Sequence, residues 1–232
     1  MKINGNIIAH RGVHDNKKTP ENSLEAFQKA IEYNYPIELD VQLTKDNILV
    51  VFHDFTLTRM TKNTNYIQDT NYQDIKDLKL LNTNEKIPTL KEVLELVDNK
   101  LLIDIEIKNT NKIKETCDIL INELKNYSNY IIKSFNPRII KYLKTNYKEL
   151  EVGLLITDKS NNFLYNKLLK SNFILKYCNP DFLAISKTLL DNKKFRKLSK
   201  SIPTLIWTIE DKKEIIDNNL IYICNNLPYI NF

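Results

Sequence analysis

The sequence predicts an α/β protein whose parallel β-sheet closes into a (β/α)8 barrel. Two observations favour this fold. Nearly continuous apolar runs of strand length recur eight times along the 232 residues, and amphipathic helical patterns separate most of them. Strands that are apolar on both faces are typical of a sheet covered by helices on both sides. A doubly wound open sheet would show the same alternation, so it remains the alternative.

The apolar runs define the expected strands in chain order. They are residues 6–10, 36–41, 101–107, 130–135, 151–156, 181–186, 203–209 and 220–224. Helices are expected over residues 21–33, 89–99 and 113–127, because apolar side chains recur there three and four positions apart. Because no linker or repeat divides the chain, residues 1–232 are predicted to form a single barrel domain.

Two segments depart from the regular alternation. Residues 55–88 are polar, with a weak helical pattern at 72–81, and they follow an additional apolar run at 48–52. We expect them to form a small insertion after the second strand. The last apolar run ends close to Phe232, so a final helix is expected to be short or absent.

The composition is that of an ordinary soluble globular protein. It is 42% hydrophobic and 27% charged, and the net charge of +5 comes from lysines scattered along the chain. This pattern argues against a nucleic-acid-binding protein, and no apolar run is long enough to span a membrane. Cys117, Cys178 and Cys224 are widely spaced and belong to no metal-binding motif, which is typical of reduced thiols in a cytoplasmic protein.

Polar residues suited to catalysis gather at the carboxyl ends of the predicted strands. They are His10 and Arg11 on the first strand, Glu38 and Asp40 on the second, His53 on the additional strand, and Glu106 and Lys108 on the next. In a barrel enzyme the carboxyl-terminal rim carries the chemistry, because the loops there vary freely above a packed interior. We therefore expect these side chains to share one site.

Three carboxylates are expected to face one another at this rim. Alternation along a strand places Glu38 and Asp40 on one face of their strand, and Glu106 and Lys108 on one face of theirs. Carboxylates that converge without cysteine or clustered histidine favour a hard cation such as Mg²⁺ or Ca²⁺. The structural alternative is a buried ion pair between a glutamate and a lysine inside the barrel.

Two of the 3 histidines end apolar strands. His10 and His53 are suited to act as a base and an acid, because imidazole titrates near neutral pH. His14 lies in the loop after His10 and is expected at the surface. Arg11 and Lys108 add a guanidinium and an ammonium group, which suit a phosphate ester that develops negative charge.

The stretch TPEN, residues 19–22, has the composition of a helix start. Thr19 is a good N-cap residue and Pro20 is a good first residue of a helix. Glu21 and Asn22 are also placed where they could face the site from that first turn.

A series of short motifs resembles one known family. In chain order its members are AHRG, PENSLEAFQKA, IELDVQLTKD, VVFHDFTLTRMT, IPTLKEVL, IEIK, SF at 134–135 and WT at 207–208. They resemble the motifs of the glycerophosphodiester phosphodiesterases, in the order in which that family carries them. The resemblance covers nearly the whole chain and is densest over residues 7–61. It implies a TIM barrel with a small insertion after the second strand.

The resemblance also implies a metal site and an acid–base pair. A divalent cation, Mg²⁺ or Ca²⁺, would be held by the residues that match the family's ligands, which are Glu38, Asp40 and Glu106. His10 and His53 match the pair of histidines that act as acid and base in the family.

Contacts with the substrate are implied at three further positions. Arg11 and Lys108 match the phosphate-binding residues of the family. Trp207 ends the seventh strand, where the family usually has an aromatic residue that walls the glycerol side. A packing role is the alternative for this tryptophan.

The chain departs from the family pattern at several positions. Glu210 stands where the family often has asparagine, and Asn225 and Asn226 stand where it usually has a GxDxxxTDxP-like strand. Asparagine also occurs near positions 34, 47 and 63–65, where the family has glycine. The altered last strand is expected to bear on stability and on the fit of the substrate.

The expected activity is metal-dependent hydrolysis of glycerophosphodiesters to sn-glycerol 3-phosphate and an alcohol by histidine acid–base catalysis. One alternative is a lysophospholipase D-like activity on lipids, which an exposed apolar ridge beside the pocket would favour. Another is a non-catalytic barrel that binds phosphodiesters or a partner protein. We expect a cytoplasmic protein that takes a small-molecule substrate, binds no nucleic acid and does not insert stably into membranes. An oligomer is compatible with the sequence.

Overall fold

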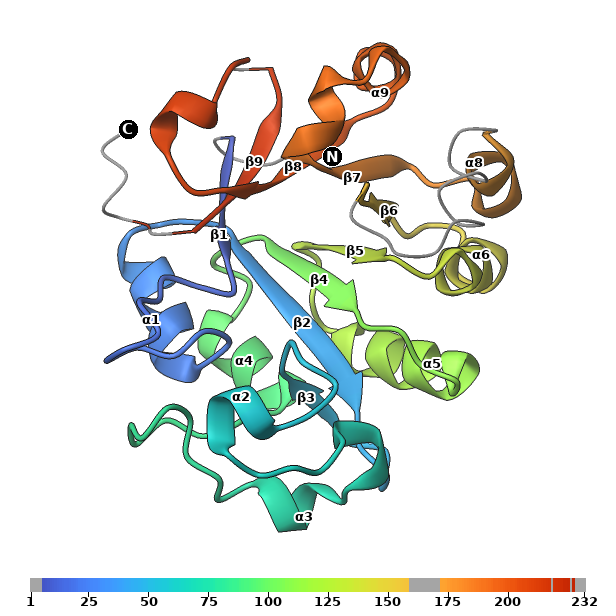
Figure 1. Ribbon diagram of the computed structural model, residues 1–232. Coiled ribbons are helices and arrows are strands. Elements are labelled where there is room, and N and C mark those ends of the chain that lie inside the picture. The colour runs from blue at the N-terminus through green and yellow to red at the C-terminus, as the bar shows by residue number, and fades with distance from the viewer. Residues whose placement is uncertain (1–5, 159–171, 218, 226, 228–232) are drawn as a thin grey trace.

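The computed structural model, which describes residues 6–158, 172–217, 219–225 and 227, shows a closed barrel of parallel strands (Figure 1). In their order around the barrel, the strands are β1 (Ile7–His10), β9 (Ile221–Cys224), β8 (Thr204–Ile209), β7 (Phe182–Ser186), β6 (Val152–Ile156), β5 (Tyr130–Ser134), β4 (Ile103–Ile107) and β2 (Ile37–Leu43). Parallel pairing of β1 with β2 closes the sheet. The predicted barrel is therefore confirmed, and the open doubly wound sheet is excluded.

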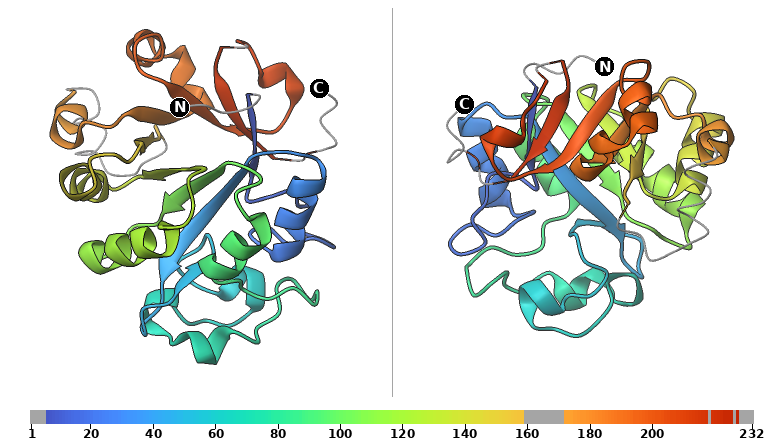
Figure 2. Two further views of the ribbon diagram at one scale, coloured as in Figure 1. Left: turned by 180° about the vertical axis from the view of Figure 1, so that it is seen from behind. Right: turned by 45° about the horizontal axis from the view of Figure 1, so that its top comes forward.

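Helices pack around the outside of the barrel, as two further views show (Figure 2). In the described residues they are α1 (Leu24–Glu32), α4 (Leu90–Val97), α5 (Ile113–Leu124), α6 (Pro137–Asn146), α8 (Phe173–Cys178) and α9 (Lys193–Leu198), with the 3-10 turns η2 (Lys187–Asp191) and η3 (Lys212–Glu214). Helix α1 begins after Ser23, whose hydroxyl accepts a hydrogen bond from the Ala26 amide. Helix α4 begins at a capping box formed by Thr89 and Glu92. The three predicted helices are confirmed, with shorter bounds.

The segment 55–88, which we expected to be an insertion after the second strand, lies beside the carboxyl end of β2 (Figure 1). It follows β3 (Leu49–Val51), which pairs antiparallel with β2, and it contains α2 (Thr58–Thr61), η1 (Ile67–Asp69) and α3 (Tyr72–Ile75). Its buried side chains form a cluster together with those of β3, and the members are Val50, Phe52, Leu57, Met60, Ile67, Ile75, Leu80 and Ile87. The insertion is therefore a packed unit with an apolar centre.

The helix expected over residues 72–81 is reduced to the single turn of α3. Beyond it, the Leu80 amide donates to the Glu85 carbonyl at 2.8 Å and the Leu81 amide donates to the Met60 carbonyl at 2.7 Å. These hydrogen bonds satisfy the backbone amides of Leu80 and Leu81 without a helix. The spacing of apolar residues in the sequence does not reveal such partners.

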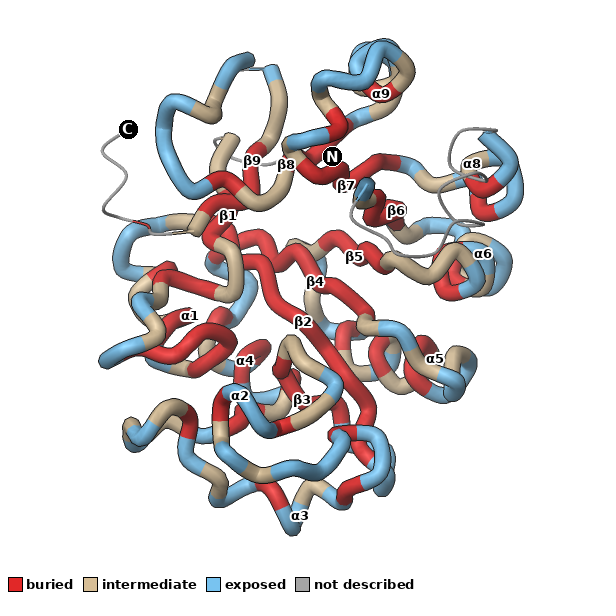
Figure 3. Tube along the Cα trace, in the orientation of Figure 1, coloured by how far each residue is buried: buried red, intermediate tan, exposed pale blue. Residues whose placement is uncertain are grey.

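The barrel interior is divided into an apolar layer and a polar layer. The apolar layer consists of Ile8, Leu102, Ile131, Leu155, Phe182, Ala184, Leu205 and Ile223, which we call the apolar plug. Side chains two positions further along a strand face the same interior. On β1, β4 and β5 these are His10, Asp104 and Lys133, so the polar layer lies above the plug at the carboxyl ends. The barrel strands are buried along most of their length (Figure 3).

Asparagine occupies two turns that require an unusual backbone. Asn34 and Asn47 have φ angles of 57° and 64°, in the left-handed region that favours glycine. Asparagine tolerates this region better than most other side chains. The absence of glycine at these two positions is therefore compatible with the turns.

Three further expectations concern a final helix, membrane-spanning segments and the cysteines. A final helix would lie after Asn225, where only Leu227 is described, so that expectation lies outside the described residues. Among the helices that are described, none is both long and apolar enough to cross a bilayer. Cys117, Cys178 and Cys224 are buried free thiols, as expected.

Candidate active site

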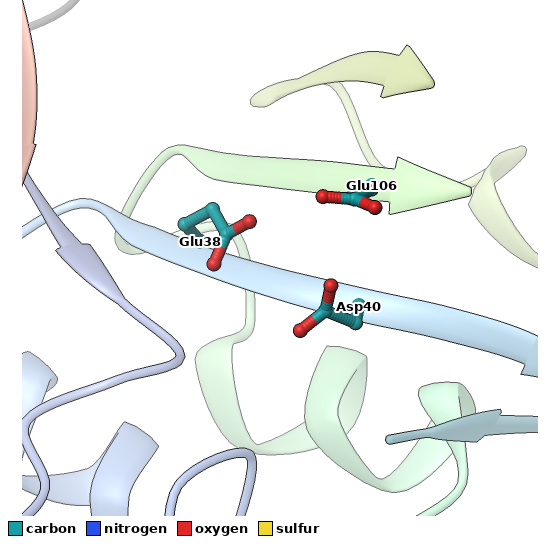
Figure 4. A group of neighbouring side chains, drawn as sticks. All are labelled: Glu38, Asp40 and Glu106. Atoms are coloured by element: carbon teal, nitrogen blue, oxygen red, sulfur yellow. The ribbon is translucent and has the colours of Figure 1, made fainter. Parts of the chain in front are cut away.

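Three carboxylates converge inside the barrel at its carboxyl-terminal rim. Figure 4 shows Glu38 and Asp40 on β2 and Glu106 on β4 pointing toward one another. One oxygen from each lies within 4.8 Å of those of the other two, and the three residues are only 2%, 1% and 6% exposed. The convergence arises because the strand register pairs Asp40 with Glu106. Carboxylates buried this closely need positive charge nearby.

Asp40 is held by two cationic side chains and one amide. Lys108 Nζ lies 3.2 Å from its Oδ1, and Arg11 Nε lies 3.3 Å from its Oδ2. Asn22 Nδ2 donates to Oδ2 at 2.9 Å. Burial alone would raise the pKa of Asp40, but Lys108 and Arg11 outweigh burial and hold this pKa well below its usual range. Asp40 is therefore ionised at neutral pH.

Glu106 has one oxygen without a well-oriented donor. Its Oε1 lies 2.8 Å from Lys108 Nζ, but within the described part of the chain it accepts no hydrogen bond of good geometry. Burial raises the pKa of Glu106 despite the opposing charge of Lys108. A buried carboxylate oxygen in this state is suited to accept a cation. The predicted ion pair between a glutamate and a lysine is thus present beside the predicted carboxylate cluster.

Glu38 is contacted through both oxygens. Its Oε1 accepts a hydrogen bond from Lys133 Nζ at 3.1 Å, and its Oε2 accepts one from the Arg11 amide at 3.1 Å. Arg11 has a φ of 55°, which turns its backbone toward this carboxylate. Burial alone would raise the pKa of Glu38, but Lys133 and His10 outweigh it and lower this pKa.

His10 stands at the end of β1 with one ring nitrogen held. Its Nδ1 donates to Asn225 Oδ1 at 2.6 Å, and its Nε2 lies 3.9 Å from Glu38 Oε2. Because an amide oxygen accepts the Nδ1 proton, Nε2 is the nitrogen with a free lone pair. Burial lowers the pKa of His10, although Glu38 opposes this effect, so the ring favours its neutral form.

His53 has a carboxylate as its partner instead. Its Nδ1 donates to Asp54 Oδ1 at 2.6 Å. Arg59 of the insertion donates from Nε to Asp54 Oδ2 at 2.6 Å. Burial alone would raise the pKa of Asp54, but the hydrogen bonds from Arg59 and His53 outweigh burial and lower this pKa. The imidazole is therefore oriented by a carboxylate that is itself oriented by an arginine.

Glu21 and Asn22 both reach toward the site from the segment before α1, whereas Thr19 and Pro20 do not start the helix, because its N-cap is Ser23. Asn22 contacts Asp40, while Glu21 accepts hydrogen bonds from Arg11 at 2.7 Å and from Arg59 at 2.7 and 3.0 Å. Burial alone would raise the pKa of Glu21, but the arginines hold this pKa far below its usual range. Glu21 thus connects the first turn of the chain after β1 with the insertion.

The polar rim opens into one pocket of about 360 Å³. Its lining residues are His10, Arg11, Glu38, His53, Glu106, Lys133, Phe135, Leu155, Trp207, Thr208 and Ile223. One side is charged and the other is apolar. Trp207 packs edge-to-face on Phe135 with ring centroids 5.6 Å apart, and its Nε1 donates to the Ala184 carbonyl at 3.0 Å. Lys108 is not among the lining residues, and its ammonium group contacts Asp40 and Glu106.

The motifs that build this pocket match a known family. The profile of the glycerophosphoryl diester phosphodiesterase family matches residues 10–225. The chain belongs to this family. A relative from Caldanaerobacter subterraneus subsp. tengcongensis, named glycerophosphodiester phosphodiesterase, is 40% identical over 161 residues. That alignment covers 64% of this chain and 65% of the relative, slightly less than two thirds of its length.

Solved structures of this family share the fold. A glycerophosphodiester phosphodiesterase from Thermotoga maritima superposes with a TM-score of 0.74 at 28% identity, covering 97% of this chain and 96% of that one. A phosphodiesterase from Oleispira antarctica, solved with the product sn-glycerol-3-phosphate, has a TM-score of 0.80 at 23% identity. The match covers 96% of this chain and 93% of that one. At that lower identity the likeness concerns the fold alone.

Several residues of the site in this family member were missed from the sequence. Lys133 lies among apolar residues in the stretch YIIKSF, and Asp104 alternates with Glu106 in LLIDIEIK. Period-two alternation was a sufficient signal for Asp104, because it places this residue on the same face as Glu106. Asn225 and Arg59 carry no comparable local signal, since their contacts with the site depend on distant segments.

His14, which we expected at the surface, is only partly exposed. Both of its ring nitrogens are buried and accept or donate no hydrogen bond among the described residues. Burial lowers the pKa of His14 to about 4. The physical reason is that the loop after β1 folds tightly against α1: Gly12 has a φ of 81°, and a Cβ there would lie 2.8 Å from Ala26. The Val13 amide also donates to the Ala26 carbonyl.

Glu210, a departure from the family pattern, does not line the pocket. It is exposed, and its amide donates to Glu214 Oε2 at 2.8 Å near η3. This substitution therefore lies outside the lining of the site. Asn225, by contrast, directly contacts His10, so the altered last strand contributes to the site.

Proposed function

We propose that this protein hydrolyses glycerophosphodiesters to sn-glycerol 3-phosphate and an alcohol with the help of a divalent cation. The observation that carries the proposal is one pocket lined by His10, His53, Glu38 and Glu106, with an Asp40 oxygen within 4.8 Å of the two glutamates. Membership of the phosphodiesterase family and the name of the Caldanaerobacter relative support the same activity. Buried free thiols support the cytoplasmic location expected from the sequence.

Glu38, Asp40 and Glu106 are the residues that would hold the cation. Their oxygens are close together and buried, and Glu106 Oε1 lacks a well-oriented donor in the described residues. An all-carboxylate donor set fits Mg²⁺ or Ca²⁺ better than a softer metal. When bound, the cation would neutralise phosphate oxygens and make the attacking hydroxyl more acidic.

His10 and His53 would move the protons of the reaction through their Nε2 atoms. His10 has an amide partner and a pKa lowered by burial, so we assign it the role of the base. His53 is oriented through Nδ1 by the carboxylate of Asp54, and we assign it the role of the acid that protonates the leaving alkoxide. Each such transfer contributes roughly 10²–10⁴-fold to the rate.

Positive charge and an apolar wall would position the substrate. Arg11 lines the pocket and is suited to contact the phosphate directly. Lys108 does not line the pocket and its ammonium group contacts Asp40 and Glu106, so its contribution to phosphate binding would be mainly long-range charge. Trp207 and Phe135 form an apolar wall against which the carbon atoms of glycerol would pack.

Release of sn-glycerol 3-phosphate from glycerophosphocholine and glycerophosphoethanolamine tests the proposal. We expect release with Mg²⁺ or Ca²⁺ and none with EDTA. His10→Ala and His53→Ala should abolish turnover without lowering the melting temperature, while His14→Ala, outside the pocket, should stay active. A folded wild-type protein that releases no product from either substrate with either cation would contradict the proposal.

A lysophospholipase D-like activity is the second candidate, because exposed aromatic residues flank the site. Phe55 follows His53 by two positions and is 48% exposed. A β-bridge joins Thr56 to Tyr66, which is 51% exposed, so two apolar surfaces lie close together at this rim. Choline release from lysophosphatidylcholine in the same assay discriminates the two activities. Faster turnover of the lipid than of glycerophosphocholine would favour the second candidate.

A further inference from the structure

Lys133 is a fully buried lysine below the candidate metal site. It stands on β5 two positions after Ile131 of the apolar plug, and it is 1% exposed. Its ammonium group lies 3.1 Å from Glu38 Oε1 and 2.5 Å from Asp104 Oδ2. A buried ammonium is costly unless carboxylates compensate it, and here two do so.

Asp104 depends on this lysine for its polar contact. It is 0% exposed, its Oδ2 accepts a hydrogen bond from Lys133, and its Oδ1 has no hydrogen-bond partner in the described part of the chain. The strand register places it directly beside Glu38. Asp104 and Lys133 therefore form a pair whose ammonium group is directed at one oxygen of Glu38.

Glu38 is fixed through this pair on one side and through the chain turn after β1 on the other. Lys133 holds Oε1, and the amide of Arg11 holds Oε2. Both oxygens are therefore fixed before any cation enters, which leaves the carboxylate little rotational freedom. Groups that orient a metal ligand in this way raise the affinity of the site by preorganising it.

We propose that Lys133, anchored by Asp104, is a positioning residue that fixes the carboxylate of Glu38 for the divalent cation. This inference rests on the proposed function insofar as Glu38 is a metal ligand. Lys133 is not a catalytic residue in this proposal, because its ammonium group is engaged by two carboxylates. It acts on the reaction only through Glu38.

The test replaces the pair without changing the net charge of the site. In Lys133→Gln/Asp104→Asn, one positive and one negative charge are removed together, and both side chains remain polar. Calorimetric titration of the substrate-free protein with MgCl₂ and with CaCl₂ measures cation binding directly. We expect affinity to fall by about tenfold or more, as for other residues that orient metal ligands.

A matched control uses an ion pair far from the rim. Lys144 on α6 contacts Asp181, which precedes β7, at 2.7 Å. The variant Lys144→Gln/Asp181→Asn loses the same two charges, and we expect its cation affinity to stay within twofold of wild type. An equal loss of affinity in both double variants would overturn the inference, because a general loss of stability would then explain the result.

The single variant Asp104→Asn keeps the inference testable if the double variant does not fold. It retains Lys133 beside Glu38 but removes the anchoring charge, so we expect a several-fold loss of cation affinity. Wild-type affinity in this variant, or in a folded double variant, would overturn the inference. Tighter binding would overturn it as well, because Lys133 would then compete with the cation.

Failure of this inference and failure of the proposed function give different results. If wild-type protein hydrolyses glycerophosphodiesters and the double variant binds Mg²⁺ and Ca²⁺ normally, only the inference is wrong. Suppose instead that the wild-type protein binds a cation, that the double variant binds it weakly, and that neither protein hydrolyses the substrate. Only the proposed function would then be wrong. A wild-type protein that binds neither cation contradicts the inference and the metal dependence together.

Discussion

Arg59 forms a bidentate ion pair with Glu21, in which Nη2 donates to Oε1 at 2.7 Å and Nη1 donates to Oε2 at 3.0 Å. This pair joins the insertion to the segment that precedes α1, 38 positions earlier in the chain. Arg59 also holds Asp54, the partner of His53, at 2.6 Å. The insertion therefore takes part in orienting a predicted catalytic histidine, in addition to covering the end of β2 (Figure 1).

Replacement of Arg59 by alanine is expected to lower kcat by about ten- to a hundredfold, a loss typical of supporting residues. The reason is that Asp54 would lose a charged donor and would hold the ring of His53 less firmly. Steady-state kinetics on glycerophosphocholine measure the change. Lys62→Ala is the matched control, because Lys62 lies in the same segment and its side chain donates only to Asn82 among the described hydrogen bonds. Wild-type kcat in the arginine variant would argue against this role.

The roles of the two histidines can be separated by the pH dependence of the rate. Asp54→Asn keeps a hydrogen-bond acceptor at Nδ1 of His53 but removes the negative charge beside the ring. If His53 is the acid, we expect the basic limb of the pH–rate profile to move to lower pH.

Asn225→Asp would give His10 a carboxylate partner in place of an amide. The pKa of His10, which burial lowers, should then rise, so the acidic limb of the profile should move to higher pH. A profile in which each variant moves the opposite limb would reverse the assignment of acid and base.

Neutralising one carboxylate of the cluster should weaken cation binding. Glu106→Gln keeps the size of the side chain but loses its charge, so we expect the concentration of Mg²⁺ needed for half-maximal activity to rise at least tenfold. Glu123→Gln is the control, because Glu123 is a half-buried carboxylate on α5. An unchanged Mg²⁺ requirement in the Glu106 variant would contradict its place in the metal site.

His14 should make the folded protein sensitive to mild acid. Its pKa falls from the ordinary value of 6.5 to about 4 in the folded state through burial. Between these values the unfolded chain takes up a proton that the folded chain does not, so stability falls as the pH is lowered through this window. From pH 7 to pH 5 we expect this residue to cost about 1–2 kcal/mol of unfolding free energy.

Urea denaturation of wild-type protein and His14→Gln at pH 7 and pH 5 measures this effect. The variant cannot take up the proton, so its unfolding free energy should fall less than that of the wild type over the same pH interval. Equal losses in the two proteins would show that the titration of His14 does not contribute.

Much of the fold was predictable because its signals are local. Apolar runs such as residues 36–41 and 101–107 are buried on both faces, so their composition indicates strands covered by helices. The prediction of a helix over residues 72–81 was wrong beyond the first turn, since the amides of Leu80 and Leu81 donate hydrogen bonds to other parts of the insertion. Periodicity does not encode such contacts.

The sequence predicted those parts of the candidate site that depend on where a residue stands along its strand. Glu38, Asp40 and Glu106 come together because they stand at the carboxyl ends of neighbouring strands, which alternation indicates. His14 was expected at the surface but is only partly exposed, with both ring nitrogens buried, because its position depends on how the loop after β1 packs on α1.

By itself, the sequence determined the order of strands and helices, the identity of the polar residues at the strand ends and the resemblance to a phosphodiesterase family. Only the tertiary structure decided which partners these residues have. Asn225 reaches His10 across 215 positions, because closure of the barrel brings β9 beside β1. Lys133 reaches Glu38 across 95 positions, because only β4 separates β5 from β2 in the sheet. Such contacts depend on the stagger of strands around a closed sheet, a property of the whole chain rather than of any segment.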